Sequence, residues 1–265
     1  MLIQITNSCS MGCRHCLQDS KVGEFNMSMD MVDKTISFIS RTPAKVINIS
    51  GGEPTEHPKF FEVLKEFCET LTAKQGYLIN IISNGSFILN DEKAREMKKF
   101  FIKYMNLRLQ ICTHKDYYPK YNEIVARLED FKKINSQVAL AINPPIYIHQ
   151  LGRAAEDSFS KEQAKKHRFT TSCLMASTTF WQLPFNVAIL SMESRAHFCT
   201  PLVDWRGDIH LSESWLCPSI GNVESFEKFM DIVQFKPCGK CADYQKLLNN
   251  KTSNYVQVKK LMNIQ

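Results

Sequence analysis

Residues 9–16 read CSMGCRHC and carry three cysteines, Cys9, Cys13 and Cys16, directly after the apolar stretch of residues 2–5. Three thiolates on one tight loop can bind three irons of a cubane [4Fe–4S] cluster and leave the fourth iron without a protein ligand. That iron can bind a small molecule, whereas a fully ligated cluster usually only carries electrons. Zinc is the alternative metal, but zinc fingers favour paired C-x2-C units that supply four ligands. The spacing C-x3-C-x2-C therefore favours the cluster.

A second motif, Gly51-Gly52-Glu53-Pro54, follows the apolar stretch of residues 46–50. Glycines at the carboxyl end of a strand let a ligand approach the backbone closely. The Glu53 carboxylate can accept charge-assisted hydrogen bonds from an ammonium group. Taken alone, the segment is more typical of an ordinary turn between a strand and a helix. Its place, one strand–helix unit after the cysteines, makes the two motifs informative together.

The cysteine spacing, the ring of His15 before the last cysteine and the Gly-Gly-Glu segment together resemble the motifs of the radical S-adenosylmethionine (SAM) superfamily. The resemblance implies that Cys9, Cys13 and Cys16 bind a [4Fe–4S] cluster whose open iron chelates the amine and carboxylate of SAM. Residues 51–53 would bind the methionine amine, and His15 would also contact the cofactor. Electron transfer into the sulfonium would then yield a 5′-deoxyadenosyl radical, which abstracts hydrogen from substrate.

The first 150 residues alternate apolar strands with amphipathic helices, and Ser28 is the expected N-cap of the first helix. Repeated strand–helix units predict an α/β fold with a parallel sheet whose strand ends point their loops at one face. The resemblance implies a partial (β/α)6 barrel rather than a closed eight-stranded one. We expect strands over residues 45–50, 77–82, 107–112 and 138–142, and helices over about 29–41, 58–74, 91–104 and 121–133.

Further candidates follow the ends of the later strands. Ser83 and Asn84 resemble a polar strand tip that borders the SAM ribose and carboxylate, although a simple Asn-Gly turn is the alternative. Arg153, in a Gly-Arg-Ala segment, resembles an arginine that reaches the SAM carboxylate. Candidates for a catalytic group are His114, as a proton donor or substrate contact, and Cys173, as a thiol near the site.

Four late cysteines, Cys199, Cys217, Cys238 and Cys241, have the spacing C-x17-C-x20-C-x2-C. Four thiolates close one [4Fe–4S] cluster or one tetrahedral zinc site. The arrangement resembles the twitch domain, a shortened, single-cluster version of the SPASM extension, which implies an auxiliary cluster suited to electron transfer. The expected domains are a barrel core over residues 1–155, barrel completion and connection over 156–198, and a small cysteine-rich auxiliary-cluster domain with a C-terminal helix over 199–265.

Composition predicts a cytoplasmic protein. The chain has 265 residues, a net charge of +6 and ten cysteines, and no apolar run is long enough to span a bilayer. The start, MLIQITNSC, lacks the basic region of a signal peptide. Ten cysteines in a reducing compartment indicate metal or cluster ligation rather than disulfides. Lysine pairs without interleaved aromatic residues give no reason to expect a nucleic-acid groove.

The function that this pattern favours is oxidative modification of a peptide or protein side chain, as in peptide natural-product maturation. Because the chain begins at its first barrel strand, a separate recognition protein would have to present the peptide. A reductant such as flavodoxin or ferredoxin would supply the electron. One alternative is a twitch-type radical SAM dehydrogenase of a small molecule such as an aminocyclitol. The other is a non-catalytic iron–sulfur electron carrier, in which residues 51–53 would bind no SAM.

Overall fold

A single mixed sheet organises the part of the chain that the computed structural model describes, namely residues 1–23, 25–42, 44–132, 138–141, 152–166, 202–210, 219 and 221–225. The strand order is β5-β4-β3-β2-β1-β6-β7-β8. The pairs from β5 across to β6 are parallel, whereas β7 pairs antiparallel with both β6 and β8. The strands are β1 (Leu2–Gln4), β2 (Val46–Ser50), β3 (Leu78–Ser83), β4 (Leu107–Cys112), β5 (Val138–Ala141), β6 (Leu202–Val203), β7 (Asp208–His210) and β8 (Gly221–Asn222).

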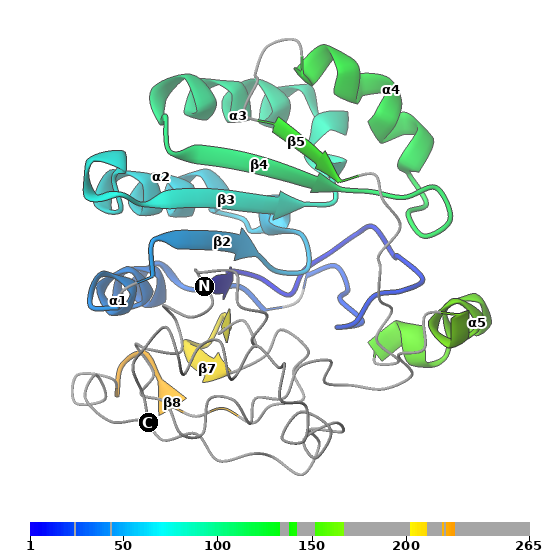
Figure 1. Cartoon of the computed structure of the whole chain (residues 1–265), viewed down its shortest axis with the longest axis horizontal. Helices are drawn as coiled ribbons and strands as arrows, with labels where there is room; N and C mark the ends of the chain where they lie inside the picture. Colours follow the sequence, from blue (N-terminus) through cyan, green and yellow to red (C-terminus); the bar gives the residue numbers. More distant parts are fainter. Residues whose placement is uncertain are drawn as a thin grey trace, which may run out of the picture.

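Helices connect the parallel strands, so that the strands end on the same side. Figure 1 shows the arrowheads of β2, β3 and β4 pointing toward the end of the sheet where the blue N-terminal loop and the green α5 lie. None of the described helices is long and apolar enough to cross a membrane. The α-helices are α1 (Met29–Ser40), α2 (Phe60–Thr70), α3 (Asp91–Lys103), α4 (Tyr121–Lys132) and α5 (Ser158–Lys166), and the 3-10 helices are η1 (Pro54–Glu56), η2 (Ala73–Gln75), η3 (Ser86–Leu89) and η4 (Gly152–Ala155).

The hydrophobic core lies between the sheet and its helices. Alternate residues of the strands face this core, because successive side chains of a strand point to opposite faces. Those that pack against α1 to α4 are aliphatic and fully buried, for example Ile3, Ile49 and Leu109. The intervening residues are largely polar, for example Gln4, Asn48 and Gln110. One face of the sheet is therefore apolar, and the other, called the polar face below, combines polar side chains with the aliphatic Leu2, Val46, Leu78 and Ile82.

Most predicted boundaries agree with the structure to within a few residues. Ser28 is the N-cap of α1, since its Oγ accepts a hydrogen bond from the Met31 amide at 3.2 Å. The helix predicted over 58–74 is wrong at both ends. It begins at Phe60 and ends at Thr70, because the buried Leu71 leaves the helical conformation (φ −98°, ψ 80°). Thr72 then starts η2 through a capping box with Gln75.

The described residues supply the five parallel strands β1 to β5 and the short parallel β6. The mixed α/β sheet is thus established. Completion of the barrel is expected over residues 156–198, of which the structure describes only 156–166. The (β/α)6 barrel, the auxiliary-cluster domain and the domain limits 1–155, 156–198 and 199–265 therefore stay predictions.

Candidate cofactor site

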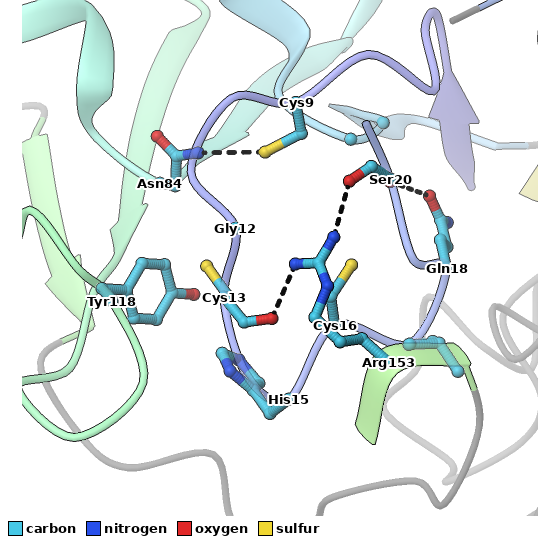
Figure 2. Close-up of a pocket in the computed structure, with 13 residues that line it drawn as sticks. Cys9, Gly12, Cys13, His15, Cys16, Gln18, Ser20, Asn84, Tyr118 and Arg153 are labelled. Carbon is cyan, nitrogen blue, oxygen red and sulfur yellow. Dashed lines mark hydrogen bonds between the residues drawn. The ribbon is translucent and has the colours of Figure 1, made fainter. Parts of the chain in front are cut away.

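A cavity of about 230 Å³ lies beside the cysteine loop and the ends of β2 and β3 (Figure 2). Segments far apart in the sequence form its wall. The loop after β1 supplies most of the wall. The segments that follow β2, β3 and β4 supply further residues, and η4 supplies one. The lining residues are Cys9, Gly12, Cys13, His15, Cys16, Leu17, Gln18, Ser20, Gly51, Gly52, Asn84, Tyr118 and Arg153. The fold thus brings together most of the residues singled out from the sequence in the N-terminal half of the chain.

The three cysteines that line the cavity suit a cluster better than a single ion. They are free thiols, and in the described part of the chain no three Cys, His, Asp or Glu side chains converge on a single-ion site. Zinc needs its ligand atoms within about 2.0–2.3 Å of one point. In a cubane each cysteine ligates a different iron, so the sulfurs need not converge. The residues present therefore fit a [4Fe–4S] cluster.

The local electrostatics show what these thiols require. The pKa of Cys9 is raised to about 12, mainly by burial and to a smaller extent by nearby carboxylates and Cys16. Burial and repulsion from Cys9 and Cys16 also raise the pKa of Cys13. Thiolates in this loop need a strong local positive charge, and a bound metal centre supplies one.

The Gly-Gly turn packs directly against the start of the cysteine loop. The Gly52 amide donates to the Thr6 carbonyl at 2.9 Å, and the Glu53 amide donates to the Ser8 carbonyl at 2.8 Å. A Cβ atom on Gly51 would lie 2.4 Å from the Thr6 oxygen, and one on Gly52 would lie 2.4 Å from the Ser8 oxygen. Both positions therefore need glycine because two backbones approach closely there.

Glu53 is fully buried and joins the ends of two strands. Its Oε1 accepts hydrogen bonds from the Thr55 amide (3.2 Å), the Thr55 hydroxyl (2.6 Å) and the Ser83 hydroxyl (2.8 Å). Its Oε2 accepts one from the Asn84 amide at 2.7 Å. Burial raises the pKa of Glu53, and these donors oppose the rise. Glu53 thus fixes the β3 tip against the Gly-Gly turn, a role that the sequence analysis did not identify; its contact with an ammonium group stays a prediction.

We expect Glu53→Gln to lower the thermal stability of the protein even without SAM. The side-chain amide of the new glutamine would present its N–H groups to at least one of the four groups that donate to Glu53. Each buried polar group left without a partner costs about 1–3 kcal/mol. A loss of that size lowers the melting temperature by about 2–4 °C per kcal/mol in a chain of about this length. Glu56→Gln is the control, because among the described residues Glu56 accepts side-chain hydrogen bonds from Ser10 alone, at a more exposed position. Equal melting temperatures for Glu53→Gln and wild type would contradict the structural role.

Asn84 contacts the first cysteine of the loop. Its side-chain amide donates to the Cys9 sulfur at 3.6 Å, and its Oδ1 accepts from the Ser86 amide at 2.8 Å (Figure 2). The second bond fixes the amide so that its N–H group points at the sulfur. Ser83 does not line the cavity; its hydroxyl is committed to Glu53. The expected contacts of Ser83 and Asn84 with SAM stay predictions.

Arg153 binds the cysteine loop. Its guanidinium donates to the Cys13 carbonyl (2.9 Å), the Ser20 carbonyl (2.9 Å) and the Asp19 carboxylate (3.1 Å). Its amide also donates to the Cys16 carbonyl at 3.0 Å. Gly152 permits this docking, since it has a φ of +53° and a Cβ there would lie 2.4 Å from the Leu17 carbonyl oxygen. The structure gives Arg153 this loop-binding role, and its expected contact with the SAM carboxylate stays a prediction.

A group of aromatic side chains lies beside Cys13 and Cys16, the last two cysteines of the loop. The His15 ring packs at 4.7 Å from Tyr117 and 5.4 Å from Tyr118, measured between ring centres. Burial, together with His114, lowers the pKa of His15 to about 4, so the ring is neutral. His114 packs on Tyr117 and is not among the described residues that line the cavity. Figure 2 shows the Tyr118 hydroxyl pointing toward Cys13. The sequence analysis missed Tyr118, although its place six residues after β4 was a signal.

The later candidates lie outside the described residues. These are Cys173 and the quartet Cys199, Cys217, Cys238 and Cys241. Their roles remain predictions.

Comparison with known proteins assigns the family. Residues 3–142, about half of the chain, match the sequence profile of the Radical SAM superfamily. The chain belongs to the radical SAM superfamily. The matched region includes the cysteine loop, the Gly-Gly-Glu turn and strands β2 to β5, so a radical SAM assignment implies one [4Fe–4S] cluster and SAM at the cavity described above. It also places the chain in a catalytic family.

Curated relatives align over little more than a third of this chain. An S-adenosylmethionine-dependent nucleotide dehydratase of Thermoplasmatales archaeon (strain ISO4-H5) is 34% identical over 93 residues, which cover 35% of this chain and 32% of the relative. A tungsten-containing aldehyde ferredoxin oxidoreductase cofactor-modifying protein of Pyrococcus furiosus is 31% identical over 100 residues, covering 37% and 26%. The chain thus matches about a third or less of the length of these relatives.

Solved structures share the fold over a longer range. The native anSMEcpe structure with bound AdoMet has a TM-score of 0.51 at 14% identity and covers 98% of this chain and 94% of that one. The same protein with AdoMet and the Cp18Cys peptide gives 0.50 at 13% identity, with the same coverage. At such low identity the likeness concerns the fold alone.

Proposed function

We propose that this radical SAM protein cleaves SAM reductively and directs the resulting 5′-deoxyadenosyl radical to hydrogen abstraction from a peptide or protein side chain, in an oxidative modification. The observation that carries the proposal is the meeting of Cys9, Cys13 and Cys16 with the Gly-Gly turn in one cavity. Cys9, Cys13 and Cys16 would hold the cluster, which would supply the electron for reductive cleavage of SAM, and a reductant such as flavodoxin or ferredoxin would replace that electron.

The chain's own residues hold and shape this site. Arg153 and Asn84 fix the cysteine loop, and the glycines at 51 and 52 let the turn after β2 pack directly against the backbone of Thr6 and Ser8. His15 is neutral and packs against Tyr117 and Tyr118, so it gives the cavity an apolar wall rather than a charge. A partly apolar wall helps to keep water from a reactive carbon radical.

A peptide substrate is supported by the shared fold. The anSMEcpe structure, which resembles this chain over 98% of its length, holds AdoMet and the Cp18Cys peptide. A separate recognition protein would present the peptide. A small-molecule substrate is the second candidate, supported by the nucleotide dehydratase that is 34% identical over 93 residues. This second candidate covers small molecules in general, including the aminocyclitol expected as the substrate of a twitch-type dehydrogenase. An electron carrier without catalysis is the third and would cleave no SAM.

Anaerobically reconstituted protein tests the proposal. Adding SAM should change the electron paramagnetic resonance (EPR) spectrum of the reduced cluster, and reductant should then yield 5′-deoxyadenosine. A lack of both responses would overturn the assignment. Stimulation of 5′-deoxyadenosine formation by peptides, but not by nucleotides or aminocyclitols, would separate the first two candidates.

We also propose that Cys199, Cys217, Cys238 and Cys241 bind an auxiliary [4Fe–4S] cluster, with zinc as the alternative. The register of the described hairpin supports the first two ligands. Leu202, three residues after Cys199, pairs with His210, and Gly221, four residues after Cys217, pairs with the adjacent Ile209. The starts of β6 and β8, which follow these two cysteines in the sequence, therefore lie at the same end of the hairpin. Such a cluster would accept the electron that remains after hydrogen abstraction.

Iron analysis checks this second cluster. We expect about eight irons per chain, from two cubane clusters. Cys238→Ala should leave about four irons and much of the uncoupled SAM cleavage, while ending turnover. A wild-type content of about four irons with one zinc would instead assign the quartet to zinc.

A further inference from the structure

The polar face of the sheet is unusual for parallel strands. Parallel sheets are normally covered on both faces and carry aliphatic side chains on both. Here the central strands β1 to β3 place Gln4, Asn48, Ser50 and Asn80 opposite the helix-covered face, and Gln4 is only 2% exposed. Buried polar groups cost stability unless they are hydrogen-bonded. The hydrogen-bond partners of these side chains therefore indicate the function of the polar face.

Gln4 differs from its neighbours in this respect. The Asn80 amide donates to Asn48 Oδ1 at 3.1 Å, and the Gln110 amide donates to the Cys112 sulfur at 3.5 Å. The side-chain carbonyl oxygen of Gln4 is buried and has no hydrogen-bond partner among the residues that the structure describes. An acceptor in this state is expensive, because it has lost water and gained nothing.

The position of Gln4 links it to the cofactor site. It pairs in register with Ser50, the residue that directly precedes Gly51 in the cavity wall. The side chains of β1 to β3 on this face are all uncharged. Of the charged groups that flank them, Asp204 is paired with Arg206, and the cationic Arg108 donates to two neutral backbone carbonyls. A cationic group brought to this face would find no counter-charge on β1 to β3.

We propose that Gln4 binds the substrate: its side-chain carbonyl accepts a hydrogen bond from a neutral substrate group that bears an N–H or O–H, such as an amide or a hydroxyl. This inference rests on the proposed function and narrows its substrate class. A carboxylate cannot donate to Gln4, and an ammonium group would be buried without a counter-charge.

The first test measures thermal unfolding of the reconstituted holoenzyme without substrate. Gln4→Met removes an unpaired acceptor and keeps the volume, so the melting temperature should stay equal or rise by about 1–4 °C. Asn80→Leu is the matched control, because it removes a paired amide from the same face and should lower the melting temperature. If Gln4→Met is destabilised as much as Asn80→Leu, Gln4 has a structural partner and the proposal fails.

The second test measures ligand binding by saturation-transfer NMR on the holoenzyme with SAM. The probes are N-acetyl-L-serinamide, which is neutral, and N-acetyl-L-aspartic acid amide, which is anionic. We expect the neutral probe to bind wild type and to lose its signal with Gln4→Met. Equal binding of both probes, binding unchanged by Gln4→Met, or no binding of the neutral probe would each overturn the inference. The EPR change caused by SAM is recorded on the same samples, and its absence would instead count against the proposed function.

Discussion

Cys13→Ala is expected to abolish formation of 5′-deoxyadenosine and to remove the SAM-dependent EPR change. Cys13 is one of three thiols that line the cavity, and the site has no surplus ligand: in the described residues no other Cys, His, Asp or Glu completes a metal site there. Two thiolates cannot hold a cubane with a single open iron. Product measured by liquid chromatography should fall to background, and the iron content should drop by about four per chain.

The matched control is Cys68→Ala. Cys68 lies in α2, is buried in the hydrophobic core at 2% exposure and is not among the residues that line the cavity. Its loss removes one buried sulfur and should cost about 1–2 kcal/mol of stability, while iron content and SAM cleavage persist. If both variants lost activity equally, general destabilisation rather than loss of a ligand would explain the result. If Cys13→Ala kept its iron, the proposed ligand set would be wrong.

Arg153→Ala is expected to make the cluster labile. Three guanidinium hydrogen bonds connect η4 to the carbonyls of Cys13 and Ser20 and to Asp19. The side chain is 28% exposed, so their joint contribution is on the order of 2–4 kcal/mol rather than the full sum. A barrier lowered by 2 kcal/mol corresponds to about a 30-fold faster release. Transfer of iron to a chelator, followed by absorbance, measures this rate.

Arg14→Ala is the control for this experiment. Arg14 also connects the cysteine loop to the same segment, through a 3.0 Å ion pair with Asp157, but its side chain is 44% exposed. It should therefore speed iron release much less. If Arg153→Ala retained iron like wild type and instead weakened SAM binding, the expected contact of Arg153 with the SAM carboxylate would become the better assignment.

The local patterns predicted the first half of the fold well. Strand 107–112 is correct to the residue, because its alternating aliphatic residues leave one register that buries Leu107, Leu109 and Ile111 together. The helix end at Thr70 was missed, since the apolar spacing continues to Leu71 while the chain leaves the helix there to bury that side chain. Periodicity records which residues are buried, not the backbone conformation that buries them.

Of the site, the sequence indicated the three cysteines and the Gly-Gly turn, which the fold brings to one cavity, because their spacing along the chain is typical of such chemistry. Metal binding by these cysteines stays a prediction. It did not predict that Glu53 would hold the β3 tip or that Arg153 would bind the cysteine loop. Both roles depend on contacts between residues 31 and up to 140 positions apart. Tyr118 was overlooked for the same reason: its place in the cavity follows from the path of the loop after β4.

The spread of these contacts along the chain has a consequence for biosynthesis. The cysteines leave the ribosome well before the segment that braces their loop, which lies 140 residues later, and the strand that pairs with β1 on its other side follows at Leu202. While these later segments are still being translated, the thiols therefore lack most of their enclosure. Iron–sulfur assembly factors are expected to deliver the metal centre only after these segments have emerged, and starvation for iron should leave a folded but loosely closed cysteine loop that proteases can reach.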